Sequence, residues 1–140
     1  MKKGLSVDGI GIRVQKTPGK GRGVIALRNF KKGDIIERAP VIVLSEKDKK
    51  LIEKTELFNH YFDWGRGSKK AAISLGWGSI YNHSWQPNAE YIHEEKNETL
   101  VFRAIRPIKK GEEICTTYNG DVKDISPYFF RRKGKLVQPK

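Results

Sequence analysis

The sequence predicts one mostly β domain with many short strands and one convincing helix. Short apolar segments recur along most of the 140 residues and are cut by Gly, Asn, Pro and charged residues, a pattern typical of half-buried strands joined by turns. The length matches one domain with a single core. We expect this core to span about residues 10–121, followed by a C-terminal segment, 122–140, whose last residues are disordered.

The first predicted elements form a hairpin. Ile10, Ile12 and Val14 alternate with small or polar neighbours, and this period of two predicts a strand with one buried face. The Pro- and Gly-rich segment 17–23 is typical of a turn, and strand character returns in segment 24–27.

Two later segments, 30–36 and 108–114, each place Lys-Lys-Gly and an acidic residue before a strand. Each predicts a tight polar turn in which the glycine adopts a positive φ. Two similar turns do not by themselves establish a repeat architecture.

The only predicted helix follows a short buried strand, 41–44. Ser45 offers an N-cap, and Leu51, Thr55 and Phe58 recur at helical spacing.

The second half of the chain predicts further strands at residues 89–93 and 100–105, joined through 94–98, and another at 115–118.

Composition excludes some classes of protein. The formal charge of +12 would attract nucleic acid or acidic partners at long range. Because Lys and Arg are spread along the chain, we expect nonspecific nucleic-acid contact rather than reading of base sequence. No apolar run has the length of a membrane helix and no signal peptide opens the sequence, so we expect no membrane partner and a cytoplasmic location, or a nuclear one in a eukaryotic host. One cysteine and three histidines without paired-ligand spacing predict no metal.

Three short motifs could carry chemistry, although each also has an ordinary structural interpretation. Segment 19–23, GKGRG, is either a glycine turn or backbone that approaches a ligand closely. Asn82, His83 and Asn88 are either turn residues and a buried histidine or part of a binding segment. Tyr118, at the end of GEEICTTY, would by itself be a packed aromatic with a solvated hydroxyl.

In combination and in this order, GKGRGV, YNHSWQPNA and GEEICTTY resemble the motifs of SET-domain protein lysine methyltransferases, especially the small viral and bacterial forms with little beyond the SET core. The resemblance runs from about Ile12 to about Asp121. It implies a SET domain of small curved sheets, with a C-terminal pseudoknot and one or two short helices. It also implies S-adenosylmethionine (SAM) as the methyl donor, S-adenosylhomocysteine as the product, and a narrow channel through which the substrate lysine enters from the opposite face.

By position in these motifs, the resemblance assigns cofactor binding to Lys20, Gly21, Arg22, Asn82 and His83. The first three would contact the methionine part of SAM through their backbone. Asn82 would bind its amino acid portion through the side chain, and the His83 backbone would contact the adenine. Tyr118 would be the catalytic tyrosine, acting as an orienting and electrostatic group rather than as a strong base.

The lysine channel is expected to include Tyr61, Tyr81 and Thr116. Many family members have Phe or Tyr at the position of Thr116, so the number of methyl groups transferred stays open. Alignment on Phe62 puts His60 where many members have a channel tyrosine. Either His60 replaces that aromatic or Tyr61 reaches into the channel, and Tyr61 is slightly favoured.

With one cysteine, the chain cannot build the cysteine-rich zinc module that follows the SET core in larger relatives. We expect an aromatic residue of the C-terminal segment, Tyr128, Phe129 or Phe130, to close over the adenine instead, with Phe129 assigned to cofactor binding.

The expected substrate is a histone-like or other basic, DNA-associated protein, and the chain could form a homodimer. A basic enzyme docks poorly on a basic tail, so either DNA bridges the two or an acidic stretch lines the channel entrance. That stretch comprises Glu90, Glu94, Glu95 and Glu98. The alternative is a catalytically weak SET module that binds protein or nucleic acid, but the intact set of Asn82, His83 and Tyr118 argues against it.

Overall fold

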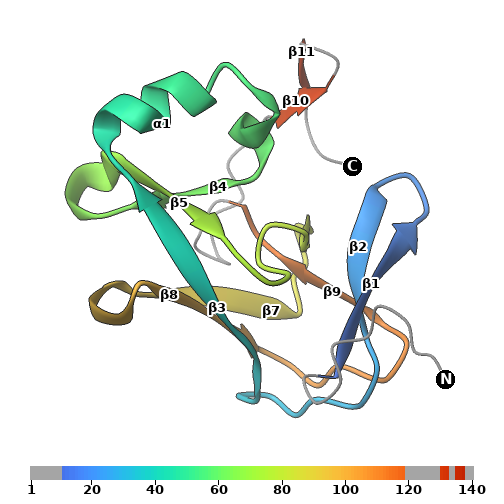
Figure 1. Cartoon of the computed structure of the whole chain (residues 1–140). Helices are drawn as coiled ribbons and strands as arrows, with labels where there is room; N and C mark the ends of the chain where they lie inside the picture. The colour runs from blue at the N-terminus through green and yellow to red at the C-terminus, as the bar shows by residue number, and fades with distance from the viewer. Residues whose placement is uncertain (1–10, 119–129, 133–134, 138–140) are drawn as a thin grey trace, which may run out of the picture.

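The computed structural model describes residues 11–118, 130–132 and 135–137, and the predicted mostly β architecture is confirmed there (Figure 1). The strands are β1 (Ile12–Thr17), β2 (Gly21–Ala26), β3 (Ile35–Leu44), β4 (Tyr61–Trp64), β5 (Lys70–Ser74), β6 (Asn82–His83), β7 (Ala89–Glu94), β8 (Thr99–Ala104), β9 (Glu113–Thr116), β10 (Phe130–Arg132) and β11 (Lys135–Val137). The helices are α1 (Glu46–Ile52) and three short 3-10 helices, η1 (Glu56–Asn59), η2 (Arg66–Ser68) and η3 (Glu95–Asn97). No described helix has the length and apolar character to cross a membrane.

Two sheets position the site. One has the strand order β1-β2-β9-β6 and the other the order β4-β5-β3-β8-β7, while β10 and β11 form a separate hairpin. Every pairing is antiparallel except that of β6 with β9. The long strand β3 pairs with β8 through its first part and with β5 through its last four residues. It therefore spans the second sheet, between the β7–β8 hairpin and the strands below α1 (Figure 1).

The predicted N-terminal hairpin is confirmed. In β1, Ile12 and Thr17 are buried, while Arg13 and Gln15 are exposed. Ile12 lies opposite Ala26 in the β1–β2 register, and both belong to the hydrophobic core. The turn joins the other ends of the two strands, where Thr17 lies opposite Gly21.

The two similar turns lie side by side. Phe30 and Ile108 exchange both main-chain hydrogen bonds, with N···O distances of 2.8 and 2.9 Å, and both side chains are buried. Gly33 and Gly111 occupy equivalent places, with φ values of +92° and +94°. The prediction of positive-φ glycines is confirmed, because this left-handed conformation is cheap only for glycine.

The predicted helix begins as expected but ends early. The Ser45 hydroxyl accepts a hydrogen bond from the Asp48 N–H at 3.1 Å, so the N-cap is confirmed. The helix α1 ends at Ile52, and the Thr55 hydroxyl accepts from the Leu57 N–H and caps η1 instead. The helical spacing of the sequence runs on past the end of α1. The helix itself is interrupted, because Thr55 adopts an extended conformation and caps η1.

The later strands agree with expectation except at β9. The strands β7 and β8 and the connection between them follow the predicted ranges within one residue. The strand β9 lies two residues earlier than predicted, because Glu113 and Ile114 pair with β2. Tyr118 leaves the strand ladder, since its N–H donates to the imidazole of His83. The chain that would complete the expected pseudoknot lies mostly outside the described residues.

Candidate active site

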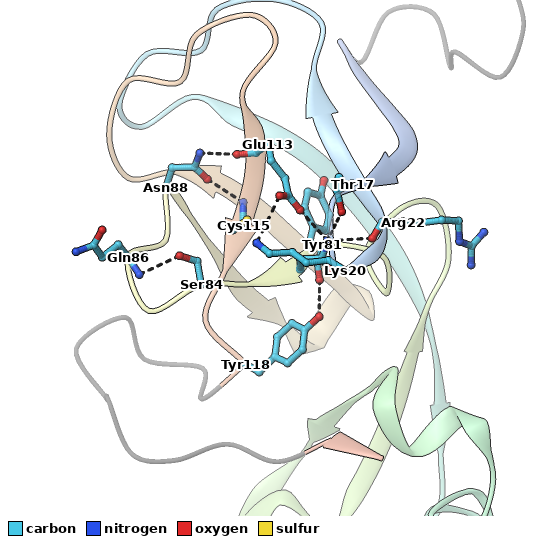
Figure 2. Close-up of polar contacts among 11 residues, drawn as sticks. Thr17, Lys20, Arg22, Tyr81, Ser84, Gln86, Asn88, Glu113, Cys115 and Tyr118 are labelled. Carbon is cyan, nitrogen blue, oxygen red and sulfur yellow. Dashed lines mark hydrogen bonds and ion pairs between the residues drawn. The ribbon is translucent and has the colours of Figure 1, made fainter. Parts of the chain in front are cut away.

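The parallel pairing of β6 with β9 brings two of the sequence motifs together. Asn82 lies opposite Cys115, and His83 lies opposite Thr116. The strand β9 also pairs with β2, so the glycine-rich hairpin approaches the same place. Three segments that are far apart in the sequence thus converge on one site (Figure 2).

Tyr118 is held at two points. Its hydroxyl donates a hydrogen bond to the main-chain carbonyl of Tyr81 at 2.8 Å, as Figure 2 shows. Its main-chain N–H donates to Nδ1 of His83 at 3.0 Å. The segment 81–83 therefore fixes both the backbone and the hydroxyl of Tyr118.

His83 is a buried neutral imidazole, 3% exposed. Burial, together with the positive charge of Lys20, lowers the pKa of His83 to about 4. An unprotonated Nδ1 is what the hydrogen bond from Tyr118 requires. The ordinary interpretation as a buried histidine therefore holds for the side chain, while contact of the His83 backbone with adenine stays a prediction.

Asn82 links the hairpin to β9. Its amide Nδ2 donates to the main-chain carbonyl of Arg22 at 2.9 Å and to the carboxylate of Glu113 at 2.7 Å. The ammonium of Lys20 lies 3.5 Å from the other oxygen of Glu113. The structure thus gathers Lys20, Arg22 and Asn82 from the predicted cofactor residues and adds Glu113.

Sequence reasoning missed Glu113. The motif Gly-Glu-Glu contains two adjacent acids, and alternation along a strand turns only one of two neighbours to a given face of the sheet. The main-chain N–H of Lys109 binds the carboxylate of Glu112, whereas Glu113 faces Asn82 and Lys20.

Gly23 lies where these side chains meet. A Cβ at this position would lie 2.6 Å from the Glu113 carboxylate, 2.7 Å from the Thr17 methyl carbon and 2.8 Å from the Asn82 amide nitrogen. The glycine is therefore required by crowding, since its φ is not among the positive values.

A pocket of about 440 Å³ adjoins Tyr118. All residues predicted for the lysine channel contribute to its wall, namely Tyr61, Tyr81 and Thr116, and His60 does so too. Further aromatic side chains come from Phe58, Phe62, Tyr91 and His93, and a carboxylate comes from Asp63. The pocket is thus rich in aromatic rings and carries one acidic group.

The structure places both alternatives for the channel aromatic at the pocket. Nδ1 of His60 lies 3.2 Å from the main-chain carbonyl of Ser79. The hydroxyl of Tyr61 donates to the carboxylate of Glu53 at 3.0 Å. His60 and Tyr61 therefore both line the pocket, and which of them serves as the channel aromatic stays a prediction.

Tyr81 contributes to the site through its main chain as well as through its ring. Its side chain is 2% exposed and stacks on Phe102. Its hydroxyl donates to Glu37 at 2.8 Å, while its main-chain carbonyl faces Tyr118.

The acidic stretch is not part of the pocket wall. Glu90 forms an ion pair with Arg103, and Glu94 forms one with Arg38. The expected position of the acidic stretch at the channel entrance therefore stays a prediction.

Of the three aromatic residues predicted to close over the adenine, the structure describes only the backbone of Phe130. Phe129 lies outside the described residues. The backbone of β10 contacts η1, and Phe58 and Asn59 of η1 line the pocket. This end of the chain therefore reaches the rim of the site.

Cys115 is unsuited to nucleophilic chemistry. Burial, followed by the charge of Glu113, raises the pKa of its thiol to about 12, so the thiolate is scarce at neutral pH. Among residues 11–118 and the two short C-terminal strands, no three His, Cys, Asp or Glu side chains gather as metal ligands.

Comparison with known proteins agrees with this geometry. The SET domain family model matches residues 21–119. The chain belongs to the SET domain family and is a protein-lysine methyltransferase.

Two curated relatives and one crystal structure illustrate the similarity. A histone-lysine N-methyltransferase of Schizosaccharomyces pombe, specific for H3 lysine-37, is 32% identical over 108 residues, which cover 76% of this chain and 72% of the relative. The histone-lysine N-methyltransferase set-1 of Caenorhabditis elegans is 28% identical over 120 residues, which cover 76% of this chain and half of that protein. A candidate histone methyltransferase of Plasmodium falciparum has a crystal structure that matches with a TM-score of 0.63 and 28% identity, covering 77% of this chain and 92% of that one.

Proposed function

We propose that the chain transfers a methyl group from SAM to a lysine side-chain amine of a histone-like or other basic, DNA-associated protein. The observation that carries the proposal is the 2.8 Å hydrogen bond from the Tyr118 hydroxyl to the Tyr81 carbonyl at an aromatic pocket. This bond directs two oxygen atoms to the place where the pocket meets β6 and β9.

The residues around Asn82 fit the amino acid portion of SAM, which carries one ammonium and one carboxylate. The Glu113 carboxylate and the Lys20 ammonium lie 3.5 Å apart, and the Asn82 amide lies against the former. Lys20 and Glu113 would take the carboxylate and the ammonium of the cofactor, with Asn82 between them. When bound, the cofactor would supply a methyl group activated on a sulfonium.

The pocket fits an amine at the end of an apolar stem. Aromatic side chains of Phe62 and Tyr91 line its wall, and the Asp63 carboxylate there is already paired with the Lys49 ammonium at 2.8 Å. The reacting amine must be neutral, and apolar surroundings lower the pKa of a lysine. The aromatic wall would therefore admit the apolar stem of the side chain, and its low polarity would favour loss of the proton to water.

The chemical role of Tyr118 follows from its hydrogen bond. Because its hydroxyl proton is donated to the Tyr81 carbonyl, its oxygen would face a bound methyl group as an acceptor of polarised C–H groups. Oxygen atoms fixed in advance stabilise positive charge that spreads in the transition state. An in-line displacement also needs the two reactants held in one orientation, and it needs no covalent enzyme intermediate.

A basic surface patch supports a DNA-associated substrate. The paired turns bring Lys31 and Lys32 beside Lys109 and Lys110, and we call these four exposed lysines the turn patch. Within the described part of the chain, the turn patch takes part in no ion pair. Unpaired lysines on one surface suit a phosphate backbone, so nucleic acid could bridge this basic enzyme and a basic substrate.

SAM binding and methyl transfer test the proposal. Calorimetry of the full chain should show binding of SAM, and tritiated SAM should label the core histones of nucleosomes more strongly than free histones. Labelling of a cell extract, followed by mass spectrometry, identifies other substrates. Binding of DNA without any binding of SAM would favour the alternative of a catalytically weak binding module.

The turn patch needs its own comparison. Replacing its four lysines by Glu should weaken binding to a short DNA duplex and reduce the slope of affinity against salt. The matched control replaces four exposed lysines near α1 and η2, Lys47, Lys50, Lys54 and Lys69. Equal losses in the two variants would show only an effect of net charge. Sedimentation velocity on the same samples tests the predicted homodimer.

A further inference from the structure

We propose that Glu37 is a positioning residue for methyl transfer, because its carboxylate holds the side chain of Tyr81 and thereby orients the hydroxyl of Tyr118. The inference rests on the proposed function, since it assigns Glu37 a part in the same reaction. Glu37 contacts Tyr81 and not Tyr118, so it acts through Tyr81 and need not touch the substrate.

Glu37 occupies a place where packing alone would favour an apolar residue. It lies on β3 and is 8% exposed, on the same face as buried Ala39 and Val41. The register of β3 against β8 shifts between Ile35 and Glu37, which marks a β-bulge, and Ile36 is buried beside Glu37. Bulges re-aim side chains and are common next to active sites.

The carboxylate is satisfied by hydrogen bonds from one segment. Its Oε1 accepts from the Tyr81 hydroxyl at 2.8 Å, and its Oε2 accepts from the Trp77 N–H at 2.9 Å. No Lys or Arg of the described chain forms an ion pair with it. Gly76, with φ +62°, leaves no room for a Cβ against the carboxylate. The Glu37 carboxylate is therefore in contact with the segment 76–81 at Gly76, Trp77 and Tyr81.

Tyr81 transmits this hold to the reaction site. Its ring stacks on Phe102 with centroids 4.3 Å apart and an interplanar angle of 18°, while Glu37 fixes the hydroxyl at the far end of the ring. A ring held along its length restrains the backbone of Tyr81, whose main-chain carbonyl accepts from Tyr118. Reactive geometry must be held to within about 0.5 Å, so loosening Tyr81 would misplace the Tyr118 oxygen.

The protonation states agree with this chain of contacts. Burial raises the pKa of Glu37, although the hydrogen bonds from Trp77 and Tyr81 oppose that shift. Burial and then the charge of Glu37 raise the pKa of Tyr81 well above its ordinary value. Tyr81 therefore remains a hydroxyl that donates to Glu37 throughout the neutral range.

The first test compares Glu37→Leu, which lacks both acceptors, with Glu37→Gln, which keeps the size and one carbonyl oxygen. We expect kcat to fall about 10- to 100-fold in Glu37→Leu, since small misplacements cost rates of this order, with the Kd for SAM within about twofold of wild type. Glu37→Gln should recover most of the loss. The control is Arg38→Gln, because Arg38 is the next residue on β3 and its side chain is exposed.

The second test does not depend on activity. NMR of chain labelled with 13C at the tyrosine Cζ reports the hydrogen bond of each hydroxyl, and Tyr118→Phe and Tyr81→Phe assign the two signals. The Tyr118 signal should move in Glu37→Leu and stay in place in Arg38→Gln. A folded Glu37→Leu protein with an unmoved Tyr118 signal and kcat within about twofold of wild type would overturn the inference.

A double-mutant comparison covers the case in which Glu37→Leu does not fold. If Glu37 acts through the Tyr81 hydroxyl, Tyr81→Phe alone should lower kcat as far as is expected for Glu37→Leu and should move the Tyr118 signal, and adding Glu37→Gln to it should cost less than about twofold more. Wild-type kcat and an unmoved Tyr118 signal in Tyr81→Phe would overturn the inference. If wild-type protein methylates nothing, the proposed function fails, and the NMR comparison still decides whether Glu37 orients Tyr118.

Discussion

The hydroxyl of Tyr118 and the main-chain carbonyl of Tyr81 lie 2.8 Å apart, although 37 positions separate the two residues. Tyr118 follows β9 and Tyr81 precedes β6, and these two strands pair in parallel. The site therefore exists only in the folded chain. The predictions below test the contacts that hold it together.

Tyr118→Phe should retain the fold and lose most of the methyl transfer. The variant keeps the ring and the N–H bond to His83 but removes the hydroxyl that donates to Tyr81. We expect kcat to fall roughly 100-fold, as when one preorganised polar group is removed. Labelling with tritiated SAM gives the rate and calorimetry gives the Kd. Full retention of labelling would refute the catalytic role.

Asn88→Ala should destabilise the protein. Asn88 is 4% exposed, its Oδ1 accepts from the Cys115 N–H and its Nδ2 donates to the Glu113 carbonyl, both at 2.9 Å. Loss of both bonds leaves buried backbone groups unsatisfied, which should lower the free energy of unfolding by about 2–4 kcal/mol. The control is Asn29→Ala, which removes one exposed bond to Lys110 and should cost about 1 kcal/mol or less. Urea unfolding measures both, and equal losses would contradict the prediction.

Gly23→Ala should impair SAM binding through crowding. Its Cβ would meet Asn82, Glu113 and Thr17 at 2.6–2.8 Å, so the cofactor residues must shift. Gly33→Ala provides the contrast, because its φ of +92° is unfavourable but no atom lies near its Cβ. We expect Gly33→Ala to cost about 1 kcal/mol of stability without changing the Kd for SAM. Calorimetry that gives both variants the wild-type Kd would show that Gly23 does not shape the site.

Stability should fall in mild acid because of His83. Its pKa is about 4 in the folded protein, whereas an exposed histidine has a pKa near 6.5. Between these values the unfolded chain binds a proton that the folded chain excludes, so the free energy of unfolding rises with pH. The stabilisation is present above about pH 6.5 and is lost as pH falls toward 4, by roughly 3 kcal/mol at most.

His83→Gln is the matched variant for this pH dependence, because glutamine can accept a hydrogen bond and does not titrate. Urea unfolding at pH 7.5, 6.0 and 5.0 gives the free energy of unfolding at each pH. This free energy should change less with pH in the variant than in wild type. Identical changes would mean that another group causes the acid sensitivity.

Local features were readable from the sequence because neighbouring residues determine them. Ser45 caps α1 through the N–H of Asp48, and Gly33 and Gly111 adopt the positive φ that their turns require. Thr55 shows the limit of this reasoning, because its side chain could continue a helix or cap a new one, and periodicity does not distinguish these outcomes.

The order of three motifs also came from the sequence alone, and with it the resemblance to the SET domain family. The motifs identified Asn82, His83 and Tyr118 as candidate residues. The side-chain partners of those residues were not readable in the same way.

Only the tertiary structure decided which residues meet at the site. It placed Glu113 against Asn82, turned the ring of Tyr81 toward Glu37, and set His60 and Tyr61 in the wall of one pocket. These contacts join residues on different strands, and their energies depend on burial and on exclusion of water. A pattern of neighbouring residues does not predict such partners. Strand pairing and the bulge in β3 depend on how the whole chain packs.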